Sequence, residues 1–138
     1  MAADCVFCKI VAGLIPSTRV FEDEHIIAIL DIAPLADGHL LIIPRSHHSQ
    51  ITEMSAEQSA ALGRHVPRLA SAVVAVTGAA GLNVLQNNGR AAGQAVDHVH
   101  VHLIPRKNGD GLGYRWNAGS YPAGRADELA QHLRAVLS

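Results

Sequence analysis

The chain has 138 residues, of which 49% are hydrophobic and 17% charged, and its formal net charge is only -1. This composition is typical of a globular protein and excludes an intrinsically disordered one, while the near-neutral charge argues against nucleic acid as a ligand. The length suits one domain, so we expect a single domain over residues 1–138, in which residues 109–138 form a C-terminal extension packed on the rest.

The start of the chain and its apolar stretches predict where the protein is found. The first residues lack the basic segment and apolar run of a secretory signal. The longest apolar stretches are interrupted by Pro34, Gly38 and Pro44, before they reach the roughly 20 residues of a membrane-spanning helix. We therefore expect a cytoplasmic protein that does not associate with membranes.

Hydrophobic periodicity and turn residues predict the secondary structure. In chain order we expect a short helix over 7–12, strands over 19–22, 26–30 and 39–44, a long helix over 55–78, strands over 82–86 and 99–104, and a helix over 127–137. Ser55 and Gln58 have the spacing of a capping box, and Pro67 predicts a kink in the long helix. Because hairpins join most of the strands, the predicted fold class is α+β, with a five-stranded antiparallel sheet, one long helix and one or two short ones.

Three histidines alternate along the last predicted strand. Successive side chains of a strand point to opposite faces, so His98, His100 and His102 are expected on one face, about 7 Å apart. A single histidine there is more often part of the packing or of an exposed polar face. Three at strict alternation favour a metal site or catalysis, with each ring neutral or partnered, because charged neighbours would repel one another.

The loop before this strand, residues 86–96, is rich in amide side chains and small residues. It could be a simple turn. However, glycines such as Gly93 let a ligand approach the backbone, and Asn87 and Gln94 offer neutral donors. Loop and histidines together are therefore a candidate phosphate site.

The segment His98-Val-His-Val-His-Leu-Ile resembles the signature of the histidine triad (HIT) family. The resemblance extends over nearly the whole chain, including Cys5-Val-Phe-Cys-Lys-Ile, Leu30-Asp31-Ile32, residues 38–47 and residues 87–94. It is strongest to bacterial members of the branch that contains nucleoside phosphoramidases. The resemblance implies the HIT fold, a purine nucleotide substrate and a homodimer that shares a sheet.

The resemblance also implies roles for individual residues. The central histidine, His100, would attack the α-phosphorus and form a nucleotidyl-histidine intermediate. His102, Asn87 and Gln94 would surround the phosphate, and Asp31 would accept hydrogen bonds from the ribose hydroxyls. His39 would orient the triad. The apolar walls around the base would be Phe7, Ile10, Ile29, Ile32 and Leu41. Ala95 and Asp97 depart from the family pattern, and Ala95 leaves the leaving-group preference open.

A metal site is implied as well. Cys5 and Cys8, with His47 and His98, resemble the tetrahedral zinc site of bacterial members. Four protein ligands leave no open position for a water molecule, so zinc there would be structural and His98 would serve the triad indirectly. The alternative for the C-x-x-C pair is a redox-active or idle pair of thiols.

The leading functional reading is an enzyme that cleaves purine nucleoside phosphoramidates or related adenylyl conjugates and releases AMP or GMP. A close alternative is a dinucleoside polyphosphate hydrolase, which differs only in the leaving group. A nucleotide-binding regulatory module and a zinc hydrolase with all three triad histidines on the metal are alternatives from other classes. The last is disfavoured because the nearby acid, Asp97, is expected on the opposite face.

Overall fold

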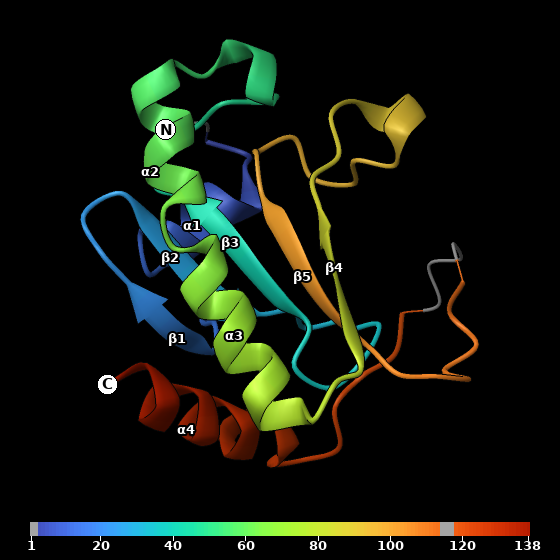
Figure 1. Ribbon diagram of the computed structural model, residues 1–138. Coiled ribbons are helices and arrows are strands. Elements are labelled where there is room, and N and C mark those ends of the chain that lie inside the picture. The colour runs from blue at the N-terminus through green and yellow to red at the C-terminus, as the bar shows by residue number, and fades with distance from the viewer. Residues whose placement is uncertain (1–2, 114–117) are drawn as a thin grey trace.

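The computed structural model describes residues 3–113 and 118–138, so residues 114–117 of the predicted C-terminal extension lie outside the described residues. Figure 1 shows a twisted sheet with helices on its faces. The strands are β1 (Arg19–Glu22), β2 (Ile26–Leu30), β3 (Leu40–Pro44), β4 (Gly81–Leu85) and β5 (Val101–Arg106). The helices are α1 (Val6–Val11), α2 (Ala56–Gly63), α3 (Val66–Thr77) and α4 (Arg125–Leu137), and short 3-10 turns cover Ile51–Glu53 and Arg90–Ala92.

The five strands form one antiparallel sheet in the order β1-β2-β3-β5-β4. Its central strands β2 and β3 are buried along their whole length, as expected for aliphatic runs bounded by turn residues. The register places Leu41 of β3 opposite Ile29 of β2 on one side and opposite His102 of β5 on the other. The predicted α+β class and five-stranded antiparallel sheet are confirmed.

The single helix predicted over 55–78 is wrong, because α2 and α3 are separate helices. The capping box of Ser55 and Gln58 starts α2 as predicted, and Gly78, with φ +66°, ends α3. Pro67 lies in the first turn of α3. A proline has no N–H and clashes with the preceding turn inside a helix, whereas neither matters in a first turn. The chain therefore breaks before Pro67 and starts a new helix instead of kinking.

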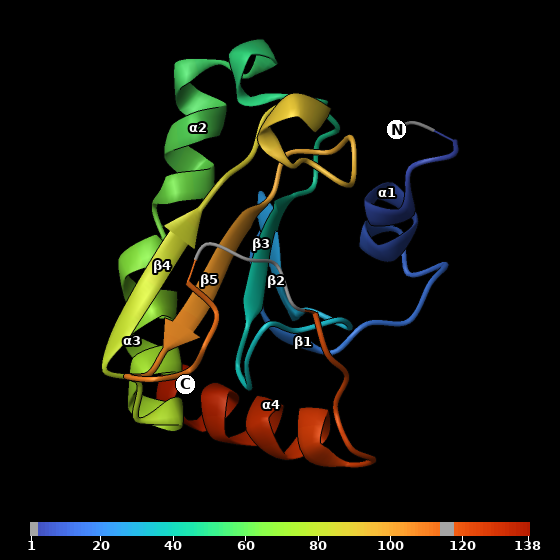
Figure 2. The ribbon, with the colours of Figure 1, turned by 90° about the vertical axis from the view of Figure 1, so that its right-hand side faces the viewer.

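The sheet separates two apolar clusters, as the period of a strand requires. Ile26, Ala28 and Leu30 of β2 face the larger cluster, which α2, α3 and α4 cover. Ile27 and Ile29 face a smaller cluster that is completed by α1. Figure 2 shows α1 on the side of the sheet opposite to α2 and α3, standing apart from the strands. Among the described residues, no helix has the length and apolar character needed to cross a membrane.

Candidate active site

A cavity of about 1110 Å³ lies on the α1 side of the sheet. Most of the residues predicted to bind substrate line it, namely Phe7, Ile10, Ile29, Asp31, Ile32, Leu41 and Gly93, together with the predicted catalytic residues His100 and His102. Except for Ile32, which follows β2, the apolar members come from α1, β2 and β3, so the alternation of buried strands supplies one wall and the short helix the other. Ile32 is 91% exposed and stands at the mouth.

The histidine segment begins before the strand that was predicted to carry it. β5 starts at Val101, because the N–H of His98 donates to Val96 O and that of Val99 to His48 O instead of pairing across the sheet. All three triad histidines are nevertheless buried, while Val99 and Val101 belong to the cluster on the other face. The expected alternation of faces is therefore present. The rings of His100 and His102 are turned toward each other, with centroids 4.8 Å apart, closer than the separation along an ideal strand.

His100 is held in one tautomer by the chain itself. Its Nδ1 lies 2.7 Å from the carbonyl oxygen of His98, which can only accept a hydrogen bond, so Nδ1 carries the proton and Nε2 keeps a lone pair. The residue is only 5% exposed, and this burial lowers the pKa of its imidazole below 6.5. The ring of Phe7 packs edge-on against it at 4.9 Å. The structure therefore presents a neutral, oriented imidazole at the cavity wall.

His102 is fixed by a second chain of hydrogen bonds. The N–H of Leu35 donates to Nδ1 of His39 at 3.0 Å, so the proton of His39 is on Nε2. That Nε2 lies 2.9 Å from Nδ1 of His102 and donates to it, which leaves the proton of His102 on Nε2. Burial lowers the pKa of His39 to about 4 and that of His102 to about 3, so both rings are neutral at pH 7. His39 thus orients His102 from behind.

Asp31 follows β2 directly and lies beside these histidines. Its Oδ1 accepts a hydrogen bond from the N–H of Ala33 at 2.9 Å, and its Oδ2 is 3.5 Å from Nε2 of His39. Burial raises the pKa of its carboxyl group. The carboxylate therefore borders the cavity at a fixed angle, with acceptor capacity left for hydroxyl groups.

The amide side chains of the loop over residues 86–96, the predicted phosphate site, lie in less direct positions. Gln94 is buried, its Nε2 donates to Ser49 O at 2.7 Å and Val96 O at 2.9 Å, and its Oε1 accepts from Gly89 N–H at 2.6 Å. This side chain holds the loop in shape, and its contact with a phosphate stays a prediction. The side-chain nitrogen of Asn87 lies next to Gly93. A Cβ atom added to Gly93 would be 3.8 Å from it. Asn87 thus borders the part of the loop that lines the cavity.

Cys5, Cys8, His47 and His98 form a second cluster beside the triad, with one ligand atom of each within 4.8 Å of the others. His98 donates from Nε2 to Pro44 O at 2.8 Å, so its Nδ1 faces the cluster with a lone pair. This Nδ1 lies 3.2 Å from His47 Nδ1, 3.3 Å from Cys5 Sγ and 3.6 Å from Cys8 Sγ. Tetrahedral zinc with nitrogen and thiolate ligands requires edges of about 3.3–3.8 Å, so the four side chains fit that ion.

The geometry separates the roles of the three triad histidines. Among the described residues, the groups suited to a metal contain His98 in one case and His102 with Asp31 and His39 in the other, and His100 in neither. A single catalytic zinc held by all three histidines is therefore not supported.

Sequence reasoning missed one group of cavity residues. Ser120, Tyr121 and Pro122, just before α4, line the cavity, and Tyr121 Oη accepts a hydrogen bond from Gly38 N–H at 3.1 Å. These residues are distant in the sequence from the others, and no local pattern distinguishes them from an ordinary turn.

The chain is similar to several known proteins. Residues 12–109 match the sequence profile of the HIT domain. Protein hit of Bacillus subtilis is 47% identical over 116 residues, which cover 83% of this chain and 80% of that protein. Adenosine 5'-monophosphoramidase hnt1 of Schizosaccharomyces pombe is 46% identical over 119 residues, 86% of this chain and 85% of that protein. The crystal structure of a Zn-bound histidine triad family protein from Mycobacterium smegmatis superposes with a TM-score of 0.85 at 40% identity, covering 97% of this chain and 93% of that one. With this similarity along most of its length, the chain belongs to the histidine triad family.

Proposed function

We propose that the protein is a nucleotide hydrolase or transferase that cleaves purine nucleoside phosphoramidates or related adenylyl conjugates at the α-phosphate. The observation that carries the proposal is the neutral His100, whose Nε2 lone pair is available because Nδ1 donates to His98 O. A neutral imidazole in a fixed tautomer is what a nitrogen nucleophile requires. The similarity to a yeast adenosine 5'-monophosphoramidase supports the same reaction class.

In this mechanism Nε2 of His100 attacks the α-phosphorus and the bond from phosphorus to the leaving nitrogen breaks. The leaving amine takes a proton from solvent, and the nucleotidyl group stays on His100. Water then attacks the phosphorus and the bond from phosphorus to Nε2 breaks, so that the nucleoside monophosphate leaves, the lone pair returns to Nε2 and the proton of the water passes to solvent. His102, with its proton on Nε2, would donate a hydrogen bond to the phosphate oxygens as negative charge develops on them.

The same proposal assigns the rest of the cavity. The base would lie between Phe7 and Ile10 of α1 on one side and Ile29 and Leu41 of the sheet on the other. Asp31 would accept hydrogen bonds from the two ribose hydroxyls. A cavity of about 1110 Å³ slightly exceeds the usual range for small-molecule sites, so a leaving group larger than ammonia would also fit. For this reason dinucleoside polyphosphates remain the second candidate substrates.

We further infer that Cys5, Cys8, His47 and His98 hold a structural zinc ion. Bound there, the ion would crosslink the start of α1 to the histidine segment, and four protein ligands would leave it no position for a reacting water molecule. We also propose a homodimer in which the edge strand β4 pairs with its symmetry mate. β4 ends the sheet order, and Val84 on it is 54% exposed.

The test of the nucleophile is intact-mass analysis of enzyme that is quenched during turnover of adenosine phosphoramidate. The wild-type protein should gain the mass of one nucleotidyl group, and the His100→Ala variant should gain none and lose turnover. A nucleotidyl adduct on that variant would refute the assignment. Relative kcat/KM for adenosine phosphoramidate and diadenosine polyphosphates ranks the two substrate classes, and negligible turnover of both with tight AMP binding would favour the regulatory module.

A further inference from the structure

The short helix α1 is the less firmly supported wall of the cavity. It has six residues, fewer than a helix needs for stability of its own. Figure 2 shows its backbone apart from the strands. The cavity residues Phe7 and Ile10 belong to this helix. Phe7 and Ile10 pack in the smaller apolar cluster, and attachments at the two ends of the helix add to this packing in fixing its position.

The metal cluster is the attachment at the N-terminal end. Cys5 is the N-cap of α1, where its Sγ accepts a hydrogen bond from Cys8 N–H at 3.3 Å, and Cys8 lies in the first turn. Cys8 Sγ reaches to 3.4 Å from His47 Nδ1. Two of the four cluster residues thus belong to the start of the helix that carries Phe7 and Ile10, and the other two belong to the body of the protein.

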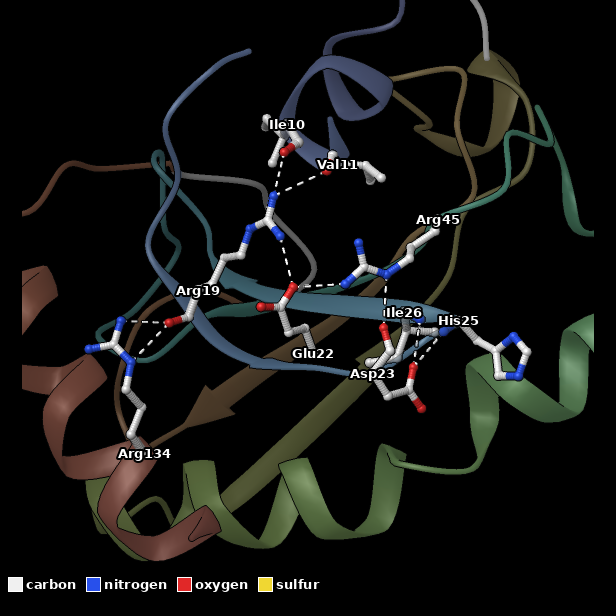
Figure 3. Close-up of polar contacts among 9 residues, drawn as sticks. All are labelled: Ile10, Val11, Arg19, Glu22, Asp23, His25, Ile26, Arg45 and Arg134. Atoms are coloured by element: carbon white, nitrogen blue, oxygen red, sulfur yellow. Dashed lines mark hydrogen bonds and ion pairs between the residues drawn. The ribbon is translucent and has the colours of Figure 1, made fainter. Parts of the chain in front are cut away.

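Arg19 of β1 is the attachment at the C-terminal end (Figure 3). Its Nη2 donates to Ile10 O at 2.6 Å and to Val11 O at 3.3 Å, two carbonyls of the last helical turn, of which Ile10 O also accepts from Gly13 N–H at 3.0 Å. The guanidinium is held in turn by Glu22, whose Oε2 accepts from Arg19 Nη1 at 2.9 Å and from Arg45 Nη2 at 2.7 Å. These two arginines lower the pKa of the Glu22 carboxyl, which keeps it charged.

The backbone of Arg19 is also fixed. Arg134 of α4 donates from Nε and Nη2 to Arg19 O, at 3.0 and 2.6 Å (Figure 3). Arg45 donates from Nε to Asp23 O at 2.8 Å, which ties the other end of the network to the β1–β2 turn. Arg19, which binds the end of α1, is therefore itself held by β1, the β1–β2 turn and α4. Its hydrogen bonds fix the end of α1 relative to these elements.

We propose that the metal cluster and Arg19 together set the position of α1, so that metal binding and nucleotide binding are thermodynamically coupled and Arg19 is a positioning residue for the nucleotide. This inference rests on the proposed nucleotide-binding function. Neither Cys8 nor Arg19 lines the cavity, so each acts on the nucleotide indirectly. Arg19 acts through α1, whereas the metal cluster acts through α1 and also through His98, whose carbonyl oxygen holds His100. Coupling of this kind is reciprocal: the metal must raise the affinity for nucleotide by the same factor as the nucleotide raises the affinity for metal.

The test is a pair of titrations on the full chain. AMP is titrated calorimetrically into zinc-loaded and chelator-treated wild-type protein, and zinc is titrated by competition with and without saturating AMP. We expect AMP to bind at least about fivefold more weakly without zinc, with the same factor in the zinc titration. Amides of α1 should also exchange hydrogen faster without zinc. Equal AMP affinity in the two forms would overturn the coupling, whereas failure of zinc-loaded wild-type protein to bind AMP would overturn the proposed function itself.

The Arg19→Met variant keeps all four cluster residues and tests the second attachment alone. It should bind zinc, weaken AMP binding at least about fivefold and raise KM while leaving kcat near the wild-type value, because the hydrogen bond from His100 Nδ1 to His98 O, which sets the tautomer of the nucleophile, does not involve α1. Arg19→Lys should restore part of the affinity, since an ammonium can still donate to one carbonyl. The matched control is Arg64→Met. Arg64 is exposed and occupies the C-cap position of α2, and this variant should bind AMP like the wild type. Should the metal-free protein unfold, unchanged AMP affinity in Arg19→Met would overturn the proposal by itself.

Discussion

Acidification should destabilise the fold, because burial keeps two histidines neutral in the folded protein. The pKa of His39 falls from 6.5 to about 4 and that of His102 to about 3. Both residues are almost fully buried, and the unfolded chain binds protons at a higher pH than the folded protein does. Stability from these groups is therefore fully present above pH 6.5 and is lost as the pH falls toward 4.

The magnitude follows from the difference in proton binding. Relative to neutral pH, each histidine lowers the free energy of unfolding by about 2 kcal/mol at about pH 5. The pair therefore lowers it by about 4 kcal/mol, a large part of the stability of a domain of this size. Urea denaturation followed by circular dichroism between about pH 7.5 and about pH 5 measures this loss.

Two variants separate these histidines from the rest of the chain. His102→Asn should lower stability at neutral pH but reduce the loss on acidification by about 2 kcal/mol. His132→Gln, at an exposed position on α4, should leave the acid dependence of the wild type unchanged. An unfolding free energy that stays constant down to about pH 5, or an acid dependence of His102→Asn equal to that of the wild type, would refute the reasoning.

Three further predictions concern single side chains. Cys8→Ser should lower the melting temperature and the zinc-to-protein ratio that is measured by plasma mass spectrometry. An unchanged ratio would refute the proposed structural zinc site. Gln94→Ala should destabilise the protein by about 2 kcal/mol, because two carbonyls and one N–H lose their partners, whereas Gln131→Ala, at an exposed position on α4, should change little. Asp31→Asn should raise KM for adenosine phosphoramidate about tenfold with little change in kcat, and a fall in kcat alone would contradict a ribose-binding role.

The sequence predicts well those features that depend on local periodicity. The five strands lie within one or two residues of their expected bounds, and the alternation of His98, Val99 and His100 correctly separates the two faces. The break at Pro67 was predicted only as a kink, because the pattern of apolar residues continues across α2 and α3 while the backbone does not.

The remaining features depend on contacts between distant segments. Arg19 caps a helix that precedes it in the chain, and Tyr121 reaches Gly38 across the fold. Gln94 satisfies backbone groups of its own loop and of Ser49, which no residue pattern announces. Such hydrogen bonds arise only after the elements have packed, so the sequence shows the donors but not their acceptors.

The cluster of Cys5, Cys8, His47 and His98 also has a consequence for newly made chains. During synthesis Cys5 and Cys8 leave the ribosome long before His98 does. In that interval the cluster lacks His98, so the two thiols lack the complete set of metal ligands. A bond between the two sulfurs in that interval would take away both thiolates. With zinc held there as proposed, each new molecule would be more vulnerable to oxidants before its histidine segment has been translated than after the fold has closed.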